Sequence, residues 1–186
     1  MTVGEILNKQ ISWYPNALSS TGYNIAFGDY FSNIVSQQYN TYIQKYRDTV
    51  EVLGKDSDFA KQLKVSSLAC VTPSGIFSER KDSGLRGDFT GIIVLDLDAK
   101  DNYGIDIDKA ILDARNIPNT LAYHKSVSGE GYAIYVYVDK WQRNTYSFAM
   151  SYYTVMLGVT FDRATSNLSR LRFNSYDEDL WLADRI

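Results

Sequence analysis

The sequence predicts an α+β fold in which helices flank a central mixed or antiparallel sheet. Three observations support this prediction. Residues 90–97 form an almost continuous β-branched and apolar run, which is typical of a strand buried on both faces. Residues 30–53 space apolar and aromatic side chains at helical intervals. Strand-like segments at 120–123 and 132–138 flank a Ser/Gly turn, and this mixture of helices with hairpin-like strand pairs favours the α+β class.

The N-terminal third is predicted to be mainly helical. Residues 30–53 hold one or two helices, and Gly54 provides a stop signal. A shorter helix follows at 57–63, with Asp56 or Ser57 as its N-cap, because a short polar side chain there can accept a bond from the first helical turn.

Strands and turns are more frequent in the rest of the chain. Pro118 ends one predicted helix and Gly158 ends another, because proline cannot continue a helix and glycine readily adopts the left-handed conformation. Residues 80–88 are polar, basic and glycine-bearing, which predicts a loop. The remaining predictions are strands at 66–71, 76–77, 90–97, 120–123, 132–138 and within 167–174, a turn at 72–75, and helices at 107–115 and 145–157.

Composition limits the possible chemistry. The 186 residues, 45% of them hydrophobic, suffice for one domain, with a mainly helical part at 1–65 and the core at 66–186. The single cysteine, Cys70, excludes an internal disulfide framework and a multi-cysteine zinc site, and its apolar context predicts a core position. The single histidine, His124, excludes HExxH and paired-histidine metal sites, so catalysis has to depend on carboxylates.

The sequence shows no targeting or membrane signal. No run reaches the ~18 apolar residues of a membrane helix, and the N-terminus lacks the order of a signal peptide. A soluble, cytoplasmic protein without a membrane partner is therefore expected. The net charge of −3 does not by itself indicate nucleic-acid binding, but a local basic cleft can exist within that average.

Asp96 and Asp98 are the strongest candidate functional residues. They alternate with leucines, so the strand period of two places both carboxylates on one face. Two neighbouring carboxylates at the end of a buried strand repel each other, and a divalent cation relieves that repulsion. The spacing equally allows two solvated acids in a polar turn, and phosphatases and glycosyltransferases also use Asp-x-Asp after a strand. A haloacid dehalogenase site is poorly supported, because Ala99 and Lys100 follow the acids in mid-chain.

The turn at 124–132 is rich in glycines and hydroxyl groups. Its sequence, HKSVSGEGY, lets backbone N–H groups approach an anion and adds hydroxyl donors, so it could cradle a triphosphate. An ordinary hairpin loop explains the same residues. The pattern lacks the P-loop consensus and does not support that type of site.

A third acid and two arginines follow the turn. Asp162 comes after a short apolar segment, and Arg170 and Arg172 alternate across Leu171, so their guanidinium groups share one face of a short strand. The planar fork of arginine suits phosphate oxygens. The alternative is a surface strand whose arginines pair with the acids at 177–179.

Four segments occur together in a fixed order along the chain. They are 68–77 (LACVTPSGIF), 91–98 (GIIVLDLD), 126–131 (SVSGEG), and Asp162 with 169–177 (SRLRFNSYD). With this order, the stretch from 68 to 182 resembles the VirE-type N-terminal domain family, which is placed within the archaeo-eukaryotic primase superfamily.

The resemblance implies a primase-polymerase-like fold and a nucleotidyltransferase, a DNA primase or polymerase, with 66–186 as its catalytic core. Asp96, Asp98 and Asp162 would be catalytic and would ligate two Mg²⁺ or Mn²⁺ ions. Expected partners are nucleoside triphosphates, single-stranded or primed DNA, and a helicase domain or protein, in the replication of a phage or other mobile element. The chain itself has no helicase motif, so it would be a stand-alone enzyme or a domain of a longer protein. Candidate nucleotide-binding residues are Lys64, Arg80, His124, Lys125, Ser126, Ser128, Gly129, Arg170 and Arg172.

Two positions depart from the family pattern. The wider superfamily has a histidine on the strand after the turn, where this chain has Tyr132, and the closer family often has a lysine where this chain has Ala133. A lost phosphate ligand would weaken nucleotide binding unless His124 and Lys125 substitute for it. A catalytically inactive module that binds nucleic acid or a replication partner is therefore an alternative, and a metal-dependent phosphatase or nuclease is a third.

Overall fold

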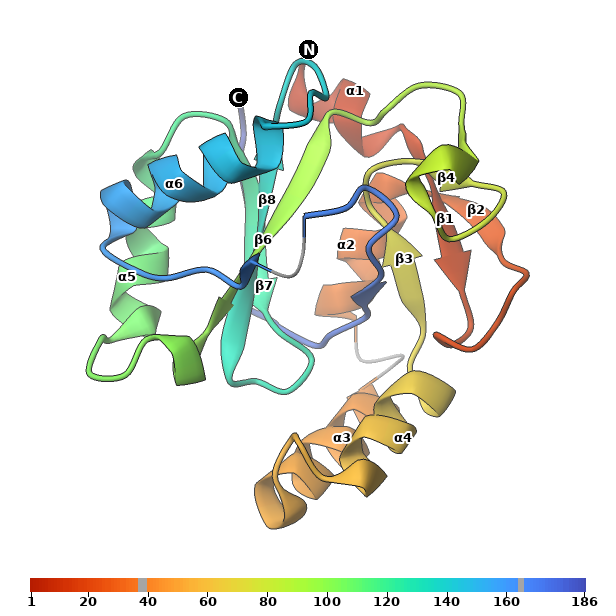
Figure 1. Ribbon diagram of the computed structural model, residues 1–186, viewed down its shortest axis with the longest axis vertical. Coiled ribbons are helices and arrows are strands. Elements are labelled where there is room, and N and C mark those ends of the chain that lie inside the picture. The colour runs from red at the N-terminus through yellow and green to blue at the C-terminus, as the bar shows by residue number, and fades with distance from the viewer. Residues whose placement is uncertain (37–39, 164–165) are drawn as a thin grey trace.

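The computed structural model describes residues 1–36, 40–163 and 166–186. Within this part of the chain, six α-helices and three antiparallel sheets form a mixed α+β fold (Figure 1), so the predicted class is confirmed. The helices are α1 (Val3–Leu7), α2 (Phe27–Val35), α3 (Asn40–Leu53), α4 (Asp58–Ser67), α5 (Ile107–Asp113) and α6 (Thr145–Leu157). Both chain ends lie on the side of the molecule opposite the hairpin of α3 and α4 (Figure 1).

The central sheet carries the strand that the sequence predicts most strongly. Its order is β10-β7-β8-β6, with β6 antiparallel to β8 over their full lengths. The register places Ala133 of β8 between Asp96 of β6 and His124 of β7. The predicted strands agree with β6, β7 and β8 to within two residues at each end. The strands are β6 (Ile92–Asp98), β7 (Thr120–Lys125), β8 (Gly131–Tyr137) and β10 (Trp181–Leu182).

A second sheet, of order β2-β1-β3-β9, joins the N-terminal part to later segments. The sequence did not predict β1 and β2, because they are short and β2 is exposed or half-buried along its length, without apolar alternation. Cys70, in β3, is fully buried as predicted. The strands are β1 (Gln10–Tyr14), β2 (Tyr23–Ala26), β3 (Cys70–Thr72) and β9 (Arg172–Phe173), and a separate pair consists of β4 (Ile76–Phe77) and β5 (Leu85–Arg86).

Most helix predictions are confirmed. Two other local predictions, the start of one strand and the extent of one loop, are wrong. The helical stretch 30–53 divides into α2 and α3, and the part of it at 37–39 lies outside the described residues. Helix α4 continues through Ser67, so the β-like segment predicted from 66 begins too early; Ser66 donates its hydroxyl back to the Gln62 carbonyl oxygen, 2.8 Å away, as a helical serine does. The predicted loop at 80–88 contains β5, because a tight turn closed by Gly84 folds the chain back onto β4.

The two faces of the central sheet are covered by different elements. Ile93, Leu95 and Leu97 pack with α5 and α6 on one face. Ile92 and Val94 pack on the other face with β1, α1 and α2. The last two residues of that second face, counting by twos along β6, are aspartates. The strand therefore has an apolar end inside the core and a polar end beyond it.

The α3–α4 hairpin has a small core of its own. Ile43, Tyr46, Val50, Ala60 and Leu68 are buried there together with Val127 of the Ser/Gly turn. Figure 1 shows the hairpin standing to one side of the two sheets. No helix in the described ranges is long and apolar enough to cross a membrane.

Candidate functional site

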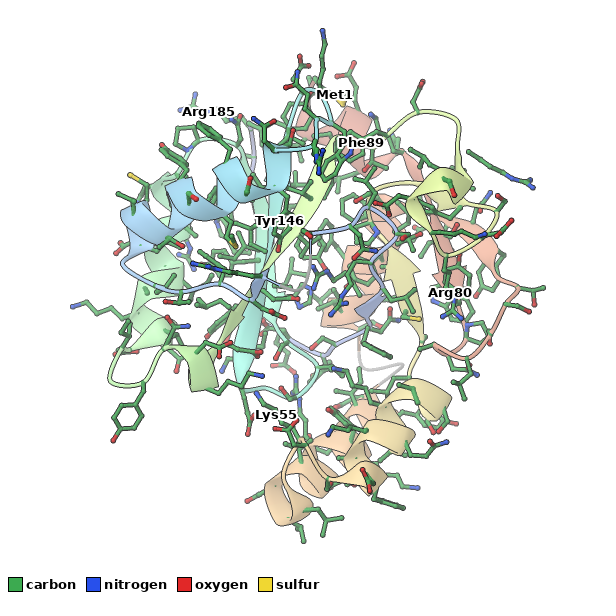
Figure 2. The ribbon with its side chains drawn as sticks, viewed as in Figure 1. Met1, Lys55, Arg80, Phe89, Tyr146 and Arg185 are labelled. Atoms are coloured by element: carbon green, nitrogen blue, oxygen red, sulfur yellow. The ribbon has the colours of Figure 1, made fainter. Side chains whose placement is uncertain are left out.

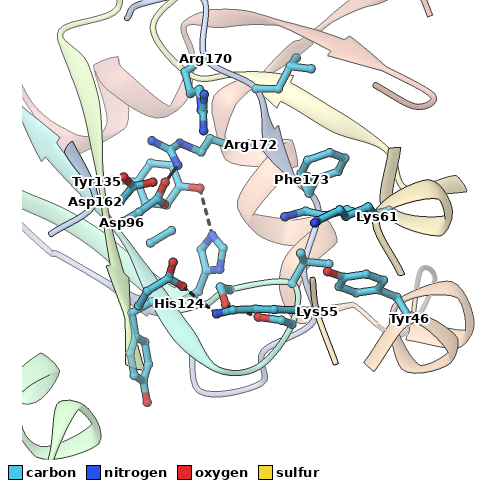
Figure 3. Close-up of a pocket in the computed structure, with 18 of the residues that line it drawn as sticks. Tyr46, Lys55, Lys61, Asp96, His124, Tyr135, Asp162, Arg170, Arg172 and Phe173 are labelled. Carbon is cyan, nitrogen blue, oxygen red and sulfur yellow. Dashed lines mark hydrogen bonds and ion pairs between the residues drawn. The ribbon is translucent and has the colours of Figure 1, made fainter. Parts of the chain in front are cut away.

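A cleft of about 690 Å³ lies where the central sheet, the second sheet and the α3–α4 hairpin meet. Figure 3 shows side chains from all three pointing into it. Seven basic side chains line the cleft, against four acidic ones. The residues that line it include Lys55, Lys61, Lys64, Arg80, Asp96, Asp98, Lys100, His124, Ser126, Ser128, Asp162, Arg170, Arg172 and Phe173.

The three predicted acids all line this cleft. Asp96 and Asp98 extend from the same face of β6, while Leu95 and Leu97 between and beside them are buried on the opposite face. Asp162 is brought beside them by the backbone, because its N–H donates to the Asp96 carbonyl oxygen at 3.0 Å. One backbone hydrogen bond thus brings Asp162 to the end of β6, although Asp162 lies more than sixty residues after Asp96 and Asp98 in the chain.

Asp96 forms an ion pair with Arg172. The Arg172 Nη1 donates to the Asp96 carboxylate, and its Nη2 donates to the Val94 carbonyl oxygen at 2.9 Å. Burial disfavours the charge on this guanidinium, but the Asp96 carboxylate outweighs burial and raises the pKa of Arg172. The surface-strand alternative for the arginines is therefore wrong for Arg172. Asp177 instead accepts the Lys125 N–H at 2.6 Å.

Asp98 has longer contacts. The Nζ of Lys55 lies 3.7 Å from its Oδ1, and the Nζ of Lys100 lies 4.0 Å from its Oδ2. Burial raises the pKa of Asp98, although both lysines oppose that rise. This carboxylate is therefore held less tightly than Asp96 and has more freedom to accept another partner.

The Ser/Gly turn is a tight hairpin connection whose hydroxyls face the cleft. The Ser126 N–H donates to the Gly131 carbonyl oxygen at 2.7 Å, and the hydroxyls of Ser126 and Ser128 lie 3.2 Å apart. Gly129 has a φ of 80°, which favours glycine at that position. Two of the predicted nucleotide ligands do not line the cleft: Lys125, whose N–H binds Asp177, and Gly129, which borders a smaller depression beside it.

Arg47 of α3 supports the turn from beneath. Its Nε donates to the Val127 carbonyl oxygen at 3.1 Å, and its Nη2 donates to the carbonyl oxygens of Ser126 at 3.3 Å and Tyr176 at 2.8 Å. Arg47 was not predicted from the sequence, because nothing in a helical periodicity indicates which distant carbonyl groups an arginine will reach. Its role here is to position the turn.

His124 is at the floor of the cleft but has no ring nitrogen left for a phosphate. It is 2% exposed, and its Nδ1 lies 2.8 Å from the Lys125 carbonyl oxygen, which can only accept. Nδ1 therefore carries the proton, and Nε2 accepts from the Tyr135 hydroxyl at 3.0 Å, which in turn accepts from Tyr30 at 2.8 Å. Burial lowers the pKa of His124 to about 4, so the ring is neutral at pH 7.

The remaining predicted cations line the cleft in different ways. Arg170 precedes β9, and only Arg172 belongs to that strand, yet both side chains face the cleft as the alternation predicts. Arg80 donates to the Ala17 carbonyl oxygen and lies 5.7 Å from the ring centroid of Tyr14. Lys64 extends over the Phe173 ring, 4.8 Å from its centroid.

Comparison with models of known protein families assigns the chain to one of them. Residues 63–181, more than half of the sequence, match the model described as "BT4734-like, N-terminal domain", a family of VirE-N-like domains. The chain belongs to this family. The resemblance to VirE-type N-terminal domains is thereby confirmed. No curated protein and no solved structure matches the chain significantly.

The match places part of the cleft inside the BT4734-like region and part before it. The acids, the turn and both arginines fall within 63–181, whereas α3, Lys55 and Lys61 precede it. Lys55 and Lys61 were also missed by the sequence analysis. Lys61 and Lys64 share a face of α4 at a spacing of three, which is the one signal that could have indicated them.

The two departures from the expected pattern have clear places in this BT4734-like domain. Tyr132 donates its hydroxyl to the Asp108 carboxylate on α5, which directs that group to the helix side. Ala133 lies between Asp96 and His124 on adjacent strands. Neither residue offers a ligand to a phosphate in the cleft.

The donor groups of the cleft fit a divalent metal in kind. Carboxylate oxygens are the ligands that Mg²⁺ and Mn²⁺ prefer, and Asp96, Asp98 and Asp162 line one cavity. In their described positions, however, Asp96 is engaged by Arg172 and Asp98 by lysines. No group of three or more His, Cys, Asp or Glu side chains that could hold a metal ion occurs among the described residues.

Proposed function

We propose that the protein is a metal-dependent nucleotidyltransferase with a primase-polymerase fold, a DNA primase or polymerase acting on a single-stranded or primed template. The observation that supports the proposal most is that the acidic end of β6, the Ser/Gly turn and the Arg170–Arg172 segment border one cleft. Carboxylates beside a cationic, hydroxyl-lined surface suit phosphoryl transfer from a nucleotide, because metal ions and cationic groups stabilise the charge on the phosphates.

The cleft suits a nucleoside triphosphate in size and charge. Its volume of about 690 Å³ is within the usual range for small-molecule sites. Basic side chains outnumber acidic ones there, although the whole chain carries a net charge of −3. Arg170 and the hydroxyls of Ser126 and Ser128 would hold the phosphates, and Arg80 and Lys64 border the same space. This concentration of positive charge favours an anionic ligand.

Asp96, Asp98 and Asp162 would hold Mg²⁺ or Mn²⁺ as a two-metal site. When bound, such ions supply Lewis acidity that lowers the pKa of the attacking hydroxyl and neutralises charge on the phosphates. The chain's own residues then bind and orient: Arg172 fixes the Asp96 carboxylate, and Arg47 fixes the turn that carries the serines. No side chain is required as the general base in this scheme.

The proposal is tested by incorporation of labelled nucleotide on primed and unprimed single-stranded DNA with Mg²⁺ or Mn²⁺. Asp98→Asn is the best variant, because the longer contacts of Asp98 make its removal the least harmful to the fold. We expect it to reduce incorporation at least ~100-fold, the size of effect found for a residue that stabilises a transition state. The matched control is Asp113→Asn, an exposed acid of α5 that does not line the cleft. A wild-type protein that neither extends nor primes, and binds no nucleotide with Mn²⁺, would exclude the enzyme.

A second candidate is a catalytically inactive module of the same fold that binds nucleic acid or a replication partner. The observation that favours it is the Asp96–Arg172 ion pair, which occupies one of the three carboxylates proposed to hold the metal. Binding of single-stranded DNA without any incorporation, unchanged by Asp98→Asn, is the result expected for this candidate.

The setting that we propose for either function is the cytoplasmic replication of a phage or other mobile element, with a helicase domain or protein as partner. The resemblance of the four ordered motifs supports this setting. Co-purification of the full-length gene product with a helicase activity would test it.

A further inference from the structure

The α3–α4 hairpin contributes three lysines to the cleft. Lys55 lies in the connection between the helices, and Lys61 and Lys64 lie on α4; all three line the cavity. Figure 2 shows Lys55 where the hairpin meets the rest of the molecule, and Figure 3 shows Lys55 and Lys61 entering the cleft from the side opposite Asp96. We call these three residues the hairpin wall, and β6 with its two aspartates the strand wall.

Lys64 is the member of the hairpin wall whose ammonium group has the fewest hydrogen-bond or ion-pair partners. Its side chain is half-buried, and burial lowers its pKa. Its ammonium lies over the Phe173 ring, but it has no hydrogen bond or ion pair with any residue in the described ranges. A partly buried ammonium without an acceptor is unfavourable, so an anion in the cleft would stabilise it.

Lys55 has partners that an anion can replace. Its Nζ lies 3.2 Å from the Glu130 carboxylate of the turn and 3.7 Å from Asp98, and its side chain is 22% exposed. Glu130 is itself 47% exposed, so water screens that pair. Phosphate oxygens entering between the two walls would bring more negative charge to Lys55 than these carboxylates do.

We propose that the hairpin wall binds the polyphosphate of the nucleotide, with Lys64 as its main contact and Lys55 exchanging its carboxylate partners for phosphate oxygens. The identity of the ligand as a nucleotide rests on the proposed function, whereas binding of polyphosphate itself needs neither a metal nor turnover. Lys61, paired with Asp56 at 3.8 Å and well exposed, is a peripheral contact. The hairpin wall lies mostly before the region that defines the family, since only Lys64 falls within 63–181.

Binding of inorganic tripolyphosphate to the whole chain, measured by calorimetry with a chelator present, tests this proposal. Lys64→Met and Lys55→Met each keep most of the apolar stem and remove one charge. We expect each to weaken binding about tenfold, as the loss of one charge-assisted contact does. Lys45→Met, on the exposed side of α3 and away from the cleft, is the matched control and should bind as the wild type does.

The exchange of partners by Lys55 has its own test. Asp98→Asn should tighten tripolyphosphate binding, because it removes a competing negative charge and releases Lys55. In the Lys55→Met background, the same substitution should have a smaller effect, since the two residues are then no longer coupled. If Asp98→Asn changed tripolyphosphate affinity equally in both backgrounds, the proposed exchange of partners by Lys55 would be wrong.

Thermal unfolding first establishes that Lys55→Met and Lys64→Met are folded. The proposed role of the hairpin wall is disproved if both variants bind tripolyphosphate like the wild type. It is also disproved if the wild type does not bind tripolyphosphate. Should the wild type incorporate nucleotide while both variants retain full tripolyphosphate affinity, the proposed function stands and the hairpin wall fails. Should the variants lose affinity while the wild type shows no incorporation, the hairpin wall stands and the proposed function fails.

Discussion

The strand wall and the hairpin wall carry opposite charges and are held in place by different means. Asp96 and Asp98 extend from β6, whose Ile92, Leu95 and Leu97 are at most 1% exposed in the interior on either face of the sheet. The hairpin wall rests on a small cluster of six buried residues, one of which, Val127, belongs to the turn. The strand wall is thus part of the main core, and the hairpin wall is an attachment to it.

The two walls also differ in how their charges are compensated. Asp96 is fixed by a buried arginine, whereas Lys64 has no carboxylate partner among the described residues and Lys55 has only partly exposed ones. Removing one partner of a buried ion pair leaves an uncompensated charge and destabilises the fold, whereas a charge without a partner is available to a ligand. Asp96 therefore has a structural role as well as the proposed catalytic one. The lysines of the hairpin wall have no comparable structural role and are available to bind a ligand.

The largest expected effect comes from breaking the strand wall at Asp96. Asp96→Ala leaves the Arg172 guanidinium, 9% exposed, without its carboxylate, and should lower the free energy of unfolding by about 3 kcal/mol. Urea denaturation measures it. Adding Arg172→Met should recover most of the loss, because no unpaired charge then remains. A variant as stable as the wild type would show that the pair contributes nothing to folding.

His124, at the floor of the cleft, should make stability depend on pH. The pKa of His124 is depressed by burial from 6.5 to about 4, so its contribution is complete above pH 6.5 and is lost as pH falls toward 4. The full loss corresponds to about 3 kcal/mol, reached only near pH 4. His124→Asn should flatten this dependence between pH 7 and 4 in melting experiments on both proteins. Parallel pH profiles would contradict the buried neutral ring.

A smaller effect should follow from cutting the link between α3 and the Ser/Gly turn at Arg47. Arg47→Met removes the hydrogen bonds from α3 to the carbonyl oxygens of Ser126, Val127 and Tyr176, and should cost about 2 kcal/mol. Tripolyphosphate affinity should fall as well, because the turn and the hairpin wall lose their common support. Arg143→Met, on an exposed segment, should change neither measurement. Rescue of affinity by Arg47→Lys without rescue of stability would separate positioning from folding.

The smallest effect should come from the turn itself. Gly129→Ala places a side chain at a φ of 80° and should cost about 1 kcal/mol. Gly104→Ala is the matched control, since Gly104 also has a φ of 80° and does not line the cleft. Both variants should lose similar stability, and only Gly129→Ala should weaken tripolyphosphate binding. Equal affinities in the two variants would mean that the conformation of the turn does not affect the ligand.

Much of the fold was predictable because it depends on local pattern. The bounds of α6 agree to the residue, since a periodic segment that ends at a glycine leaves a clear signal. The bounds of β6, β7 and β8 agree within two residues, since strongly apolar runs also leave a clear signal. The strands β1 and β2 were not predicted, because neither has the alternation that a half-buried strand needs. The candidate site was predicted in its acids, serines and arginines, but not in Lys55, Lys61 or Arg47.

The sequence by itself determined that Asp96 and Asp98 share a face of one strand, because the backbone geometry of a strand leaves no other arrangement. Only the tertiary structure decided that Arg172 pairs with Asp96, that both ring nitrogens of His124 are engaged, and that the hairpin lysines face the acids. The physical reason is the separation in sequence between the residues in contact. Periodicity is a property of consecutive residues. Apart from the contact of His124 Nδ1 with the neighbouring Lys125, the contacts named above join residues from 11 to 76 positions apart, and only the packing of the whole chain brings them together.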